Sequence, residues 1–130
     1  MHDDNTNSFD TEPMVFMGLH PDGSFSLAEA SSDPDEAAFA ISEVIGGGTT
    51  RVTMPGVDAY ISQLHQLDPD LKHNPYASHL VQVATGTTDT VSGPIVFIGR
   101  NVDGVDTGIS LWLVSELLKF VHLMNTQVLA

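Results

Sequence analysis

The sequence predicts an α+β fold, in which two to three helices pack on one face of a mainly antiparallel sheet. Short alternating segments and longer helical segments follow one another in mixed order, with turn residues between them. The length of 130 residues and the 42% hydrophobic content are typical of one folded domain with its own core. We expect residues 14–130 to form this domain and the polar, acidic residues 1–13 to form a flexible tail.

The first two elements read as the strands of a hairpin. An apolar run covers residues 14–19, and residues 24–28 alternate polar with apolar side chains. Between them lies the sequence His-Pro-Asp-Gly at 20–23. Proline fixes φ and glycine accepts a positive φ, so this sequence favours a tight turn between two strands.

The sequence Asp-Pro-Asp-Glu at 33–36 marks the start of a helix. Asp33 suits the N-cap, proline suits the first helical position, and Glu36 stands where a capping box needs it. The glycines at 46–48 suit the end of the helix. The apolar face that we predict for this helix consists of Ala37, Ala38, Phe39, Ala40, Ile41, Val44 and Ile45.

Further strands and a helix are predicted in the middle of the chain. Residues 49–54 alternate and are β-branched, which favours a strand. Residues 57–65 also favour a strand, although their spacing suits a short helix too. An asparagine followed by proline at 74–75 predicts the start of another helix. The next strand is expected over 91–98, with a loop over 101–108.

The last predicted element is a helix over residues 109–124. Its polar side chains form one narrow stripe, and broad apolar flanks lie on both sides of it. Such a helix is heavily buried, either against the sheet or against another subunit. We therefore predict self-association as a homodimer through residues 109–124.

The charge excludes several classes of function. Seventeen acidic against four basic residues give a net charge of -13. So few basic side chains cannot build a surface for DNA or RNA, or attach the protein to an anionic membrane. No apolar run approaches the ~20 residues of a membrane span, and the start lacks a secretory signal, so we expect a cytoplasmic protein. Without cysteine, disulfides and thiolate chemistry are excluded.

The acidic residues gather in the first half of the chain. Residues 1–58 hold 11 acids and one base, a net charge of -10, whereas residues 59–130 hold six acids and three bases, a net charge of -3. Such asymmetry indicates an interaction face, or else a need for solubility or salt adaptation. The candidate residues of an acidic interaction face are Asp33, Asp35, Glu36, Glu43 and Asp58.

A set of turn and strand residues carries a resemblance to a known family. These are Gly46-Gly47, Leu71-Lys72, Asn74-Pro75, Ala77, Asp89, Gly93-Pro94 and the apolar run at 95–99. Over roughly residues 14–104 the chain resembles the family called domain of unknown function 3846, small proteins of phages, plasmids and bacterial genomes. The resemblance implies an accessory protein of a phage or mobile element, and it supplies no catalytic residues.

The leading hypothesis joins this resemblance to the acidic first half. It is a non-enzymatic protein that binds a host protein in counter-defence, against restriction or CRISPR nucleases, for which mimicry of DNA charge is one route. The alternative is a protein that sequesters a nucleotide-type signal. Its candidate ligand-binding residues are Gly47, Gly48, Arg51 and Arg100, although helix termination explains the same glycines.

We expect no metal ion, cofactor or catalytic residue. His65, His73 and His79 are the histidines nearest to one another in the sequence, and their spacing matches no metal-ligand signature. No local motif supports a nucleophile with its base.

Overall fold

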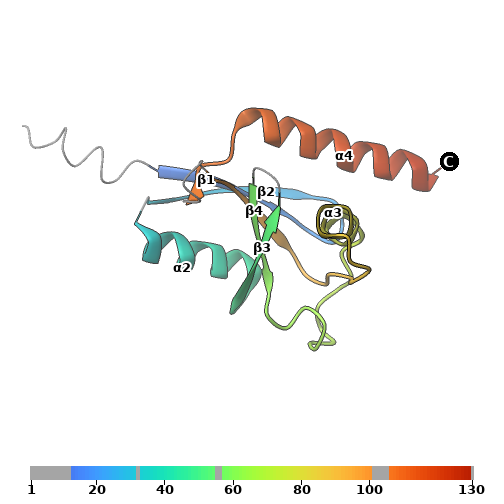
Figure 1. The fold of residues 1–130 in the computed structure, drawn as a ribbon, viewed down its shortest axis with the longest axis horizontal. Helices are drawn as coiled ribbons and strands as arrows, with labels where there is room; N and C mark the ends of the chain where they lie inside the picture. The colour runs from blue at the N-terminus through green and yellow to red at the C-terminus, as the bar shows by residue number, and fades with distance from the viewer. Residues whose placement is uncertain (1–12, 32, 55–56, 101–105, 130) are drawn as a thin grey trace, which may run out of the picture.

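The structure is a computed structural model that describes residues 13–31, 33–54, 57–100 and 106–129 (Figure 1). Its strands are β1 (Pro13–Leu19), β2 (Phe25–Ser31), β3 (Thr49–Met54), β4 (Val57–Ser62), β5 (Ile95–Arg100) and β6 (Asp106–Thr107). Its helices are α2 (Pro34–Ile45), α3 (Pro75–Thr85) and α4 (Leu111–Leu129). The sheet has the order β2-β1-β5-β4-β3, β6 pairs with β5, and every pairing is antiparallel. The predicted α+β class with an antiparallel sheet is confirmed.

The helices cover both faces of the sheet rather than one. Figure 1 shows α2 on one side of the strands and α4 on the other. The central strand β5 explains this arrangement, because its side chains alternate between two cores. Ile95 and Phe97 pack with α3 and α4, whereas Val96 and Ile98 pack with α2. A strand that is apolar on both faces needs cover on both faces, so the predicted placement of all helices on one face is corrected.

The hairpin of β1 and β2 forms as predicted. Leu19 pairs with Phe25, and Gly23 takes a positive φ of 87° in the turn. Asp22 closes this turn by accepting hydrogen bonds from the hydroxyl of Ser24 at 2.6 Å and from its backbone N–H at 2.9 Å. The hydroxyl bond is the main reason that the pKa of Asp22 lies below its ordinary value, and the backbone bond adds to it.

The Asp33 N-cap and the glycine C-cap of α2 form as predicted, whereas the backbone N–H of Asp33 donates to the hydroxyl of Ser31 at 2.9 Å and not to Glu36, as a capping box would require. The carboxylate of Asp33 accepts from the backbone N–H of Asp35 at 2.8 Å and from that of Glu36 at 3.4 Å. At the other end Gly46 takes the left-handed conformation, with φ 90°. A residue with a Cβ is strained in this conformation, which is why glycine ends the helix here.

Two strands in the middle of the chain differ from the prediction in their bounds. The segment predicted over 57–65 is a strand and not a helix, but this strand, β4, ends at Ser62, where a turn follows. The strand predicted over 91–98 begins only at Ile95, because the segment before it forms backbone hydrogen bonds with the residues that precede α3. The carbonyl of Val91 accepts from the backbone N–H of Asn74 at 2.8 Å, and Gly93 donates to the carbonyl of Lys72 at 2.7 Å. These bonds hold the segment away from the sheet ladder.

The end of the chain also differs in detail. β6 lies within the stretch predicted as a loop over 101–108, and α4 covers 111–129 instead of 109–124. Residues 55–56 and 101–105 lie outside the described part of the chain. The tail predicted over 1–13 lies outside it too, apart from Pro13, which begins β1.

Candidate functional site

The outward side of α2 presents acidic side chains around one aromatic ring. Asp33, Asp35, Glu36 and Glu43 are all exposed, as expected for an interaction face. Phe39 stands four residues from both Asp35 and Glu43, so these three share one side of the helix. We call Asp33, Asp35, Glu36, Phe39 and Glu43 the α2 acidic face.

Phe39 departs from the sequence prediction, which placed it on the apolar face. The side of α2 that meets the sheet consists of Ala37, Ile41 and Ile45, which are buried. Phe39 is 65% exposed. The helical spacing of the buried side chains already places Phe39 on the opposite side, and that signal was available in the sequence.

Asp58 does not belong to an exposed face. It lies on β4, is fully buried, and forms an ion pair with Arg51 of β3. Its register partner on β5 is Ile98, whose side chain belongs to the core under α2. A buried carboxylate requires a partner of opposite charge, and Arg51 supplies it. This correction leaves four acids on the predicted interaction face.

The candidate nucleotide site is not assembled as an anion cradle. The backbone N–H groups of Gly46 and Gly47 both bond to the carbonyl of Ser42, at 2.8 and 3.1 Å. This glycine segment follows the C-terminal end of α2, where the helix dipole disfavours an anion. Gly48 is exposed, and its carbonyl accepts from Gln63 at 3.0 Å.

The two arginines of that candidate site lie in different surroundings. The guanidinium of Arg51 pairs with Asp58, and its side chain is 45% exposed. Arg100 ends β5, where its backbone pairs with Asp106. The side chain of Arg100 lies outside what the structure describes, so its part in the prediction is not tested.

Two of the three histidines of the candidate metal cluster, His73 and His79, have other contacts. The ring of His79 stacks on Phe120 of α4, with 5.6 Å between ring centroids. His73 forms an isolated backbone bridge with Ser92. Within the described part of the chain, no group of three or more His, Asp or Glu side chains could hold a metal ion.

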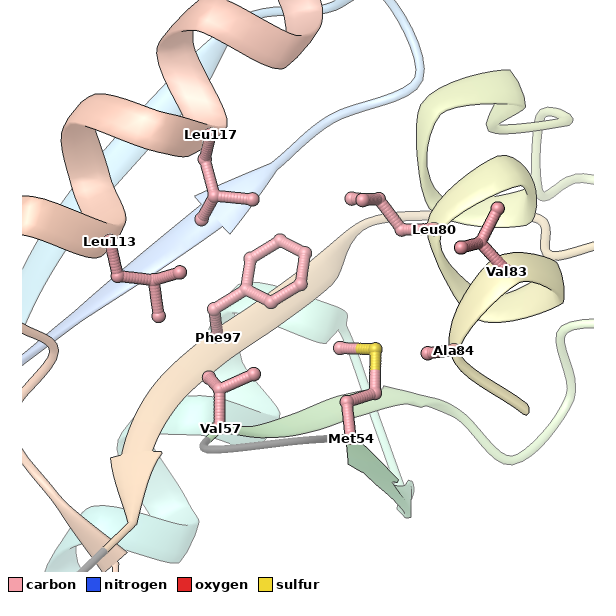
Figure 2. A pocket seen from close by; sticks show the side chains of 8 residues that line it. All are labelled: Met54, Val57, Leu80, Val83, Ala84, Phe97, Leu113 and Leu117. Carbon is pink, nitrogen blue, oxygen red and sulfur yellow. The ribbon is translucent and has the colours of Figure 1, made fainter.

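An apolar pocket of about 370 Å³ lies between α3, α4 and the sheet (Figure 2). Sequence analysis gave no indication of it, because its walls come from five elements that only the fold brings together. The lining residues are Met54 of β3, Val57 of β4, Phe97 of β5, Leu80, Val83 and Ala84 of α3, and Leu113 and Leu117 of α4.

The outer side of α4 keeps exposed apolar side chains beside its polar stripe. Leu117 and Val121 are buried against the sheet, which accounts for one side of the helix. The outer side carries Leu111, Trp112, Leu118 and Leu123, all exposed, which we call the α4 outer face. Trp112 is 71% exposed. Helical spacing places Leu111 and Leu118 on one side of the polar stripe and Trp112 and Leu123 on the other, and exposed apolar side chains of this size mark an interaction site.

Among the helices in the described residues, none combines the length and the apolar content that crossing a membrane requires. Comparisons of the chain with protein-family models, curated protein sequences and solved structures gave no match. The resemblance to domain of unknown function 3846 therefore stays a prediction.

Proposed function

We propose that the protein is a non-enzymatic interaction protein that binds a basic surface of another protein through the α2 acidic face. The observation that carries this proposal is the 65% exposure of Phe39 among carboxylates. A phenylalanine that is mostly exposed on a helix contributes little to the stability of the fold, whereas aromatic side chains supply much of the binding energy at protein interfaces.

The charges around Phe39 determine what kind of partner fits. α2 carries Asp35, Glu36 and Glu43 and no basic side chain. A matching partner therefore has an apolar pocket for the ring, with lysine or arginine side chains at its rim. Such complementarity raises the rate of association and excludes acidic partners, while the buried ring provides affinity.

The biological role that we propose for this binding is counter-defence against a host nuclease or its accessory protein. The proposal rests on the predicted resemblance to an accessory family of phages and mobile elements, and it is supported by a net charge of -13 that suits a partner built to bind DNA. A nuclease cleft is basic because it must neutralise phosphates, so it has the charge that the α2 acidic face requires.

We expect Phe39→Ala to weaken partner binding by about 30-fold, which corresponds to about 2 kcal/mol at an interface hot spot. Wild-type protein would be immobilised, and retained proteins from lysate of the host cell would be identified and then titrated individually by calorimetry. Raising the salt concentration should also weaken binding, because the rim contacts are between exposed charges.

The matched control is Leu67→Ala. Leu67 is 77% exposed in the turn that follows β4, so this change also removes an exposed apolar side chain, but not from the α2 acidic face. It should leave the affinity unchanged. A partner that binds Phe39→Ala as tightly as wild-type protein contradicts the proposal, and so does failure to capture any protein at low salt.

The α4 outer face supports a second contact, with another copy of this chain. α4 carries one acidic and one basic side chain, Glu116 and Lys119, which pair at 3.2 Å. Two such faces can therefore meet without the like-charge repulsion that a net charge of -13 would otherwise cause. Because α2 covers the other side of the sheet, its acidic face stays accessible in such a dimer (Figure 1).

We expect light scattering to give the mass of a dimer at micromolar concentration. Replacing both Trp112 and Leu118 by serine should give a monomer, since these changes remove the apolar surface that the dimer would bury. The same double change at Leu64 and Leu67, which are also exposed, should leave the dimer intact. A monomeric wild-type protein would exclude self-association through α4.

A further inference from the structure

We propose that the pocket between α3 and α4 binds an uncharged aliphatic chain. This inference is independent of the α2 acidic face, because the two sites lie on opposite sides of the sheet. In Figure 2 Leu113 and Leu117 of α4 face Leu80 of α3 across the ring of Phe97. The pocket is thus a space between two helices that has a floor of sheet side chains.

The floor of the pocket is fixed and its mouth is open. Phe97 is 1% exposed on the central strand, and Met54 and Val57 beside it are buried as well. Val83 lines the pocket and is 73% exposed, so the opening to solvent lies on the α3 side. Solutes can reach the pocket without a change in the sheet.

The lining determines the chemistry of the occupant. All eight lining side chains are apolar. A water molecule needs two to four polar partners, and these side chains offer none. A hydrocarbon needs no such partners, and it makes dispersion contacts with lining side chains that have no contact partner when the pocket is empty. The volume of about 370 Å³ is more than twice that of an engineered apolar cavity of about 150 Å³ that accepts benzene.

The charged side chains of the two helices and the net charge of the chain disfavour a ligand with an anionic headgroup. The sequence of α3 has no Lys, Arg, Asp or Glu, and the Lys119 ammonium of α4 is engaged by Glu116. A fatty acid carboxylate would therefore meet no lysine or arginine on α3 and only the already paired Lys119 on α4, and the net charge of -13 would repel it. An alcohol or a neutral ester carries the same chain without that cost.

Decanol and decanoate provide the test, with the full chain and with chemical-shift titration and thermal melting as readouts. We expect saturable decanol binding that shifts resonances of the lining residues and raises Tm, and weaker binding of decanoate. Ala84→Leu should abolish decanol binding, because the larger side chain occupies the pocket. Ala38→Leu makes the same change on the exposed side of α2 and should leave binding intact.

A second variant keeps the proposal testable if Ala84→Leu does not fold. Val83 is exposed, so Val83→Asp should fold, and a carboxylate at the mouth should weaken decanol binding. The proposal is overturned if decanol shows no saturable binding, or if binding persists in both variants. Conversion of a dimer into monomers by decanol would also overturn it, because a second copy of the chain would then be the occupant.

Discussion

Replacing Phe97 by alanine is expected to lower the free energy of unfolding by about 3–5 kcal/mol. Phe97 is 1% exposed at the centre of the sheet, where its register partners are Met17 of β1 and Ala59 of β4. Both neighbouring strands hold the backbone in place, so the site cannot collapse to fill the space that the ring leaves. Urea denaturation followed by circular dichroism measures the loss.

Phe39→Ala is the matched control for this prediction. It deletes the same ring at a site that is 65% exposed, and it should change stability by no more than about 0.5 kcal/mol. The two variants therefore separate the ring that holds the fold together from the ring that we propose for binding. Equal losses in the two variants would contradict the assignment of Phe97 to the core.

The elements that sequence analysis located correctly are those with local causes. α2 begins at an aspartate followed by proline and ends at Gly46 because these residues satisfy its terminal backbone groups within a few positions. The turn at 20–23 is local in the same sense. α3 begins at an asparagine followed by proline for the same reason as α2. None of these features needs a distant part of the chain.

The prediction of helices on one face of the sheet was wrong, and the sequence of β5 shows why. Residues 95–98 form an uninterrupted apolar run, which is typical of a strand covered on both faces. If helices covered only one face of the sheet, every second side chain of this apolar run would face water. The strand order β2-β1-β5-β4-β3 was not predictable in this way, because it depends on pairings between strands far apart in the chain.

In the candidate site too, residues placed by local sequence were predicted correctly and residues placed by strand pairing were not. Asp33, Asp35, Glu36 and Glu43 are exposed because they occupy a helix cap and the outer side of a helix, which spacing alone indicates. Asp58 is buried because β4 lies between β3 and β5 and turns this side chain toward α2. Its pairing with Arg51 depends on the register of β3 against β4, in which Met54 pairs with Val57, and the sequence prediction of two strands did not extend to their register. The apolar pocket depends on register and helix packing together.

Asn74→Ala is expected to cost about 3 kcal/mol or more in the free energy of unfolding, as an N-cap and a buried amide are lost together. Asn74 is fully buried, and its side-chain amide donates to the carbonyls of Leu19 and Gly93 at 3.1 and 2.9 Å. Its side-chain carbonyl accepts from the backbone N–H of Ala77 at 2.9 Å. One side chain thus joins the end of β1, the start of α3 and the segment before β5.

Asn74→Asp separates these contributions because it has nearly the same shape. The aspartate keeps an acceptor for Ala77 but replaces the donor with an oxygen that faces the carbonyls of Leu19 and Gly93. It should therefore be at least as unstable as the alanine variant in thermal and urea unfolding at neutral pH, although aspartate is itself a good N-cap. Stability near that of the wild-type protein would mean that capping of α3 alone explains Asn74, and that its bonds to β1 and to the segment before β5 contribute little.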